Sequence, residues 1–328
     1  MAMSNLPSIE SNPIADLSYR NYDGPLRPPT FRWWTIARQT IRAVSKNKWL
    51  WIMSGLAGAY FVIMIIFLFV VDRLVAANPN MEQFQRLLIG QLVWKEQFNH
   101  GVGFAQIPSM VIAMIVGAGA IANDNRANAL LVYLSKPCTR FDYAFGKWVG
   151  VFLLLLAALA IPALGFYAYG ALSFRDLGFF KQDPWLLLRI LATLPLCAAL
   201  NTSIILAISS LFKQGRMAGA VYAGIYFLGD FFTRIMAVVW AIGRRGHDAP
   251  AIVKYLYYTS IDGLQIGLSK SILGAKGTNL LGIPVNGRGM PHPPPAPPLV
   301  PCLLIVLLVT LLSIAVTWKR VRAVEVVG

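Results

Sequence analysis

Residues 49–71 read WLWIMSGLAGAYFVIMIIFLFVV and contain no charged side chain. At 1.5 Å per residue, an α-helix needs about 20 residues to cross the roughly 30 Å hydrocarbon core of a bilayer. This stretch is long enough, and no small-residue cleavage site of a secretory signal peptide follows it. It therefore predicts a membrane-spanning helix that the chain retains.

Five further apolar stretches are long enough to span a membrane. Four carry no charge, and the other, 217–242, contains Asp230 and Arg234. The six predicted spans are 49–71, 102–122, 148–172, 190–212, 217–242 and 299–318. With 57% hydrophobic and 13% charged residues, a single water-soluble domain is excluded. We expect an all-α integral membrane protein with six transmembrane helices, whose membrane domain comprises residues 49–318.

Six spans place both termini on one side of the membrane, and the distribution of basic residues predicts which side. The segments on the terminal side are 1–48, 123–147, 213–216 and 319–328, and they hold 16 Lys and Arg residues against 12 in the other loops. The bias is sharpest in the short turn 213–216 and in the basic tail 319–328. We expect both termini to be cytoplasmic in a multi-pass protein of a prokaryotic plasma membrane.

The N-terminal arm, residues 1–48, ends in a basic amphipathic pattern. Trp33, Ile36 and Ile41 recur at helical spacing, while Arg38 and Arg42 fall on another face. Such a helix lies in the headgroup layer of a membrane. The pattern is also that of an ordinary positive flank that orients the first span, and both interpretations stay open.

Proline positions predict breaks in the helices. Pro108, Pro162 and Pro195 each fall within a predicted span, where proline kinks a helix. The long external loop 243–298 ends in a proline-rich stretch. This stretch, residues 284–301, contains eight prolines and runs into the start of the last predicted span. We expect this segment to form an extended strap of polyproline type.

Motifs for catalysis are missing from the sequence. No GxxxxGK[ST] motif is present to hold nucleotide phosphates, and the three histidines have no metal-binding spacing. We therefore expect no enzyme activity and no cofactor in this chain. The net charge of +15 is spread over arm, loops and tail, so we expect contacts with anionic membrane lipids and none with nucleic acid.

Asp230 and Arg234 need an explanation, because a charge at mid-membrane costs about 2.5–3.5 kcal/mol on insertion scales. Four residues apart, they share a helix face and can neutralise each other. The alternatives are that the pair marks a break in the helix near Gly229, or that it forms a polar contact on a transport path or between subunits.

The connection between the second and third spans, residues 123–147, reads NDNRANALLVYLSKPCTRFDYAFGK. Leu130, Leu131 and Leu134 share one face of a short predicted helix that begins near Asp124 and ends before Pro137. Such a compact amphipathic element is joined to two membrane helices. It therefore has the form required to transmit a displacement by a soluble partner to the membrane helices.

This connection resembles the signature loop of permease subunits of type-2 ATP-binding-cassette (ABC) exporters. In that family an acid precedes a leucine-rich helix, a Leu-Ser-x-Pro-x-(Ser/Thr)-Arg turn and a Gly-Lys pair. The residues that match this pattern are Asp124, Leu130, Leu131, Leu134, Ser135, Pro137, Thr139, Arg140, Gly146 and Lys147. Their neighbour Arg126 is assigned to the same element. The family's Gly-Thr pair is absent, and Ala127 and Asn128 stand near its place.

The resemblance implies a permease that pairs with a second permease subunit, as a homodimer or heterodimer, and exports its substrate. Separate ATPase subunits bind ATP and Mg²⁺ and act through residues 123–147. Two other functions remain as alternatives: a secondary transporter with Asp230 as its ion site, and a non-transporting anchor of a complex. A membrane-bound lipid enzyme would need clustered His, Asp or Glu at a membrane face, and the sequence contains no such cluster.

Overall fold

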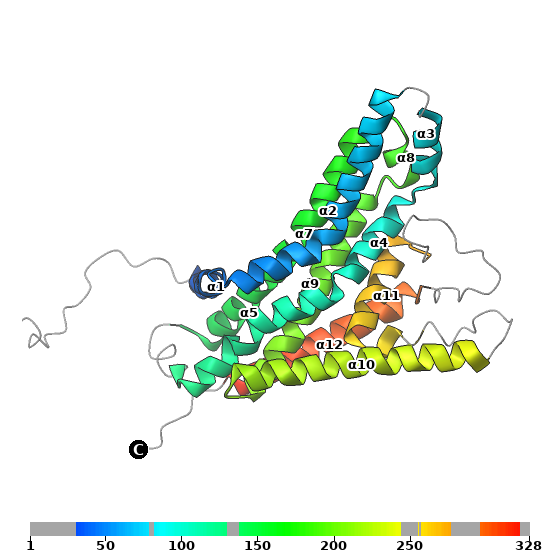
Figure 1. Ribbon diagram of the computed structural model, residues 1–328. Coiled ribbons are helices and arrows are strands. Elements are labelled where there is room, and N and C mark those ends of the chain that lie inside the picture. Colours follow the sequence, from blue (N-terminus) through cyan, green and yellow to red (C-terminus); the bar gives the residue numbers. More distant parts are fainter. Residues whose placement is uncertain are drawn as a thin grey trace, which may run out of the picture. The chain divides into compact units, whose positions relative to one another are not determined.

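The computed structural model consists of helices joined by turns and short connections over the residues it describes, which are 31–78, 82–129, 138–243, 255, 257–276 and 296–321. The chain divides into Met1–Phe31 and Arg32–Gly328, and the helices belong to the second unit. They are α1 (Arg32–Val44), α2 (Lys48–Ala77), α3 (Glu82–Gln91), α4 (Trp94–Phe104), α5 (Gln106–Arg126), α7 (Arg140–Ser173), α8 (Phe179–Gln182), α9 (Leu186–Leu211), α10 (Gly215–Gly243), α11 (Ile261–Leu273) and α12 (Leu299–Arg320) (Figure 1).

Among the described residues, five helices are long and apolar enough to cross a membrane. These are α2, α5, α7, α9 and α12, and they correspond to five of the six predicted spans, although the helix of the second span begins at Gln106 and not at residue 102. The sixth, α10, has 29 residues, or about 44 Å of helix, but Asp230 and Arg234 lie within it. Its helix runs unbroken past Gly229, so the alternative of a break there is wrong.

Several helices are longer than the charge-free stretches that predicted them. α2 has 30 residues and α7 has 34, or about 45 Å and 51 Å. Both exceed the roughly 30 Å hydrocarbon core, so their ends carry charged residues beyond it. The side chain of Asn47 caps α2 by accepting a hydrogen bond from the Trp49 amide at 3.0 Å.

Pro108 lies in the first turn of α5, where the missing amide has no helical partner to lose. The predicted interruption of this span is present and lies at Ala105, between α4 and α5, about one turn before Pro108, because a proline ring excludes a helical bond to the carbonyl four residues earlier, here that of Phe104. Pro162 and Pro195 lie inside α7 and α9 as predicted. Pro162 packs against Gly58 of α2, where a Cβ atom would lie 2.7 Å from the proline ring.

The predicted external loop returns to the bundle. α11 is 13 residues long, about 20 Å, too short to cross a membrane, yet most of its side chains are buried against α4, α9, α10 and α12. Ser260 caps its start, and Gly274 ends it with a positive φ of 68°. Pro298 and Pro301 of the predicted strap belong to the cap and first turn of α12, and residues 284–295 lie outside the described part.

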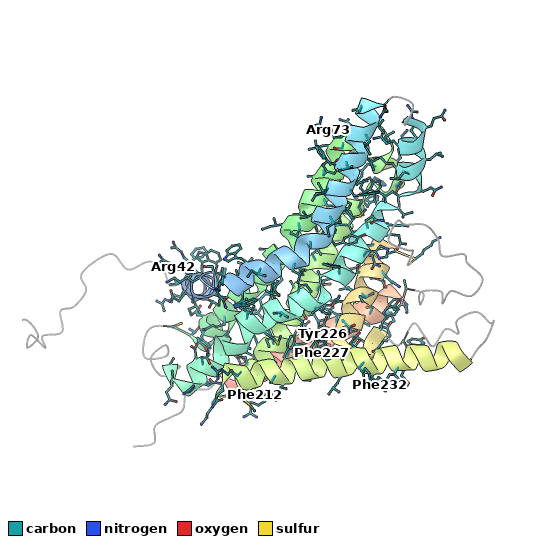
Figure 2. All side chains as sticks on the ribbon, viewed as in Figure 1. Arg42, Arg73, Phe212, Tyr226, Phe227 and Phe232 are labelled. Carbon is teal, nitrogen blue, oxygen red and sulfur yellow. The ribbon has the colours of Figure 1, made fainter. Side chains whose placement is uncertain are left out.

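One end of the bundle gathers the ends of several helices and is named the α5–α7 end, because α5 ends and α7 begins there. Ile36 of α1, Tyr143 of α7 and Val321 after α12 form a small buried cluster. The first described helix and the end of the last one therefore meet at this end. Figure 2 shows Arg42 of α1 and Arg73 of α2 at opposite ends of the bundle.

Candidate functional site

The described part of the predicted connection 123–147 is mostly helix. Its first residues complete α5, and its last eight form the opening turns of α7. Leu130, Leu131, Leu134, Ser135 and Pro137 lie within 130–137, outside the described residues. The other six predicted residues are described: Asp124, Arg126, Thr139, Arg140, Gly146 and Lys147.

Asp124 and Lys147 form an ion pair that joins α5 to α7. The Lys147 Nζ atom lies 2.8 Å from the Asp124 Oδ2 atom, and the two side chains are 11% and 20% exposed. The hydroxyl of fully buried Tyr143 donates a hydrogen bond of 2.7 Å to the same oxygen. Lys147 also lies over the Tyr143 ring, 5.7 Å from its centroid. A charge-assisted bond that is largely shielded from water fixes the two helix ends more firmly than an exposed pair would.

Thr139 fixes the point at which α7 begins. Its hydroxyl accepts a hydrogen bond from the Asp142 amide at 3.1 Å, and the Asp142 carboxylate accepts one from the Thr139 amide at 3.0 Å. This reciprocal pair is a capping box. Arg140, the first residue of α7, is exposed and makes no ion pair with a described acid. A soluble partner can therefore reach Arg140.

Gly146 and Gly150 let α1 pack directly on α7. A Cβ atom on Gly146 would lie 2.6 Å from the Trp33 carbonyl oxygen and 2.8 Å from the Ile36 Cβ atom. A Cβ atom on Gly150 would lie 2.9 Å from the Thr40 Cβ atom. The sequence G-x-x-x-G is a known spacing for close helix contact in membranes. Sequence analysis assigned Gly146 to coupling but missed this spacing, which was the available signal.

Polar contacts tie the end of α5 to α9 and to the turn before α10. Ser209 accepts hydrogen bonds from the Ile121 and Ala122 amides and donates one to the Ala118 carbonyl, at 2.8–3.1 Å. Asn125 donates to the Ser210 carbonyl at 3.3 Å. Motion of the α5 end is therefore shared with α9. Sequence analysis missed these residues, because polar side chains at helix ends carry no specific signal.

An open cavity of about 790 Å³ lies between α5 and α10 at the same end. Arg126 of α5 and Arg216 of α10 line it, together with Asn123 and several small residues. A Cβ atom on Gly215 would lie 2.9 Å from the Gly119 Cα atom, so the helices approach closely beside it. Sequence analysis placed Arg126 in the coupling element, and the structure also places it at this cavity.

Asp230 has a different described neighbour from the one predicted. Its carboxyl group interacts with that of Asp262 on the buried helix α11. The side chain of Arg234 lies outside the described residues, so its predicted pairing with Asp230 stays a prediction. On the same helix, Tyr226 is buried beside exposed Phe227 and donates a 2.7 Å hydrogen bond to Gln106 of α5 (Figure 2).

Comparison with known proteins gives one family match. The family model described as ABC-2 family transporter protein matches residues 34–320, which run from α1 to the end of α12. No curated protein matches the chain. The family match covers most of the sequence and includes every residue of the candidate site.

Proposed function

Because this chain belongs to the ABC-2 family of transporter proteins, and is thus a membrane permease that works with an ATPase subunit, we propose that it exports its substrate and is driven through its α5–α7 end. The Asp124–Lys147 ion pair carries this proposal. It joins the end of α5 to the start of α7, the two helices that flank the connection, so a force on the connection moves them together.

The contacts around this pair spread such a movement through the bundle. α1 rests on Gly146 and Gly150 of α7, and Ser209 links α5 to α9. A displacement at the α5–α7 end is therefore transmitted to three spanning helices, α5, α7 and α9, and to the surface helix α1. Packed helices transmit displacement because protein interiors are nearly incompressible.

In this proposal the ATPase subunit binds ATP and Mg²⁺, because the sequence has no P-loop of its own. The cavity between α5 and α10 borders the substrate pathway, and a second permease subunit completes that pathway. The exposed apolar side chains of α10 and α12 contact this subunit or lipid.

Co-purification with the ATPase tests the proposal. We expect a subunit that carries a P-loop to purify with the tagged full-length chain in equal amounts. Arg140→Glu should reduce the recovered ATPase at least about tenfold, because it reverses an exposed charge at the docking end. A glutamate at the first position of a helix suits the helix dipole, so α7 itself should stay intact.

Arg175→Glu is the matched control, since Arg175 is exposed just beyond the other end of α7. It should leave the ATPase yield unchanged. Purification of a folded permease without any P-loop protein, or equal yields for Arg140→Glu and wild type, would contradict the proposal.

In this proposal the α5–α7 end faces the cytoplasm, and the natural thiol of Cys138 tests that orientation. Cys197 and Cys302 are buried, at 1% and 0% exposure, while Cys138 is half-buried between α5 and α7. A maleimide that cannot cross membranes should label Cys138 in inside-out vesicles and not in intact cells. Burial and the charge of Asp142 raise the pKa of the Cys138 thiol, so labelling should be faster at pH 8.5 than at pH 7.

Cys138→Ser should abolish the label and serves as the control. Labelling of wild type from outside intact cells would place the α5–α7 end on the external face and would refute the orientation.

A further inference from the structure

An apolar cavity of about 200 Å³ lies between α7, α9 and α12 near the α5–α7 end. Its wall is mostly aromatic and aliphatic and consists of Phe141, Ala144, Phe145, Trp148, Ser203, Leu206, Ile314, Thr317 and Trp318. Pockets for whole drug-sized ligands are about 300–1,000 Å³. This cavity is smaller, so it suits part of a molecule.

The two polar side chains in the wall are already engaged. Ser203 accepts a 2.9 Å hydrogen bond from the indole nitrogen of Trp148, and Thr317 donates a 3.0 Å bond to the Ser313 carbonyl. Both are buried. An occupant therefore gains little by carrying polar groups, and a hydrocarbon chain fits the wall best.

The cavity opens toward the surface that the membrane covers. Phe141, Trp318 and Ile314 line it and are 54%, 47% and 41% exposed. Along α12, exposed leucines such as Leu308 and Leu311 continue the apolar surface away from the cavity. A chain that enters the cavity can thus extend along α12 into the bilayer.

Positive charge borders the same place. Lys319 and Arg320 directly follow Trp318, and Arg140 directly precedes Phe141; all three are exposed. None of them forms an ion pair with a described acid. Asp142, the acid nearest to Arg140 in the sequence, is turned back to Thr139 by the capping box. Each basic residue near a membrane surface attracts anionic headgroups by about 1 kcal/mol, or about fivefold in affinity.

We propose that this cavity binds one acyl chain of an anionic phospholipid whose headgroup contacts Lys319, Arg320 and Arg140. The lipid belongs to the leaflet at the α5–α7 end, which is the cytoplasmic leaflet in the orientation proposed above. Bound there, it joins the start of α7 to the end of α12, two helices that pack less extensively on each other than on α9. Lys319 and Arg320 are not among the proposed ATPase-docking residues, so their contact with the lipid is independent of docking, whereas Arg140 is shared with the proposed docking surface.

Native mass spectrometry of the full-length chain, released from vesicles of equal phosphatidylglycerol and phosphatidylcholine, tests the proposal. We expect about one retained phosphatidylglycerol per chain and at least fivefold less phosphatidylcholine. The double variant Lys319→Gln, Arg320→Gln should lower phosphatidylglycerol retention to near the phosphatidylcholine level. These two positions are exposed, so the substitutions leave the fold intact.

Ala144→Phe places a ring in the cavity and should remove at least about 80% of the retained lipid. Ala168→Phe is its control, because Ala168 is exposed on the same helix, away from the cavity. It should retain lipid as wild type does. Equal retention of the two lipids by wild type, or wild-type retention by Ala144→Phe, would overturn the proposal.

The C-terminal residues 322–328 are the rival occupant from this chain. If wild type retains no lipid but the chain truncated after Val321 does, the cavity belongs to the tail and the proposal is wrong. Retention that is the same with and without the tail supports the lipid.

Discussion

Gly146→Leu is expected to release α1 from α7. The smallest side chain at this position would already lie 2.6 Å from the Trp33 carbonyl oxygen, and backbone cannot rotate away as a flexible side chain can. Overpacking of this kind costs about 1–3 kcal/mol. The three atoms nearest to such a Cβ atom all belong to α1, so the cost falls first on this contact.

Trypsin measures the release, since Arg38 and Arg42 lie exposed on α1 and are cleaved when the helix opens. A cost of about 1–3 kcal/mol predicts cleavage about 5- to 150-fold faster than in wild type. The assay uses membrane vesicles that contain the protein in the orientation in which the protease reaches α1.

Gly165→Leu is the matched control on the same helix. No atom lies within 4 Å of a Cβ atom built on Gly165, so the added side chain meets open space. Cleavage should then be unchanged. Equal cleavage of Gly146→Leu and wild type would show that α1 does not depend on this contact.

The sequence predicted the spanning helices well, because charge-free runs of about 20 residues have few other structures available in a membrane. It also predicted that Asp124 and Lys147 act in one element, and the structure joins them at 2.8 Å. The helix ends were less predictable, since α2 and α7 continue past the charges that bound their apolar runs.

Features set by tertiary contacts could not be predicted. α11 is short and carries Asp262, Gln265 and Lys270, so only its neighbours show that it is buried. Gln265 illustrates the reason: its amide pairs with that of Asn201 on α9, a residue 64 positions away. A proline, by contrast, predicts a break locally, and α4 ends about one turn before Pro108.

Asp124→Leu is expected to uncouple the permease from its ATPase. The substitution leaves Lys147, only 11% exposed, without its described carboxylate. Removing one partner of a fully buried ion pair costs about 3–5 kcal/mol, and partial exposure lowers this to about 2 kcal/mol. In a two-state equilibrium, this free energy raises the ratio of separated to joined helix ends, the start of α7 and the end of α5, by about 25-fold.

Two variants separate coupling from stability. The double variant Asp124→Lys, Lys147→Asp exchanges the two charges and restores an ion pair, so it should recover much of the coupling. Asp183→Leu breaks another 2.8 Å ion pair, the one with Arg189. Arg189 lies near the start of α9, at the opposite end of that helix from Ser209. This substitution should lower stability by less, because Arg189 is 38% exposed and still donates to the Leu273 carbonyl, and it should leave coupling intact.

The most direct measurement is ATP hydrolysis by the assembled permease and ATPase in lipid nanodiscs, compared with the ATPase subunit alone. We predict that wild-type permease changes the hydrolysis rate and that Asp124→Leu loses at least about 90% of this change at equal amounts of folded complex. The exchanged pair should restore it, and Asp183→Leu should keep it. A complex with Asp124→Leu that hydrolyses ATP as wild type does would contradict the claim that the α5–α7 end couples the two subunits.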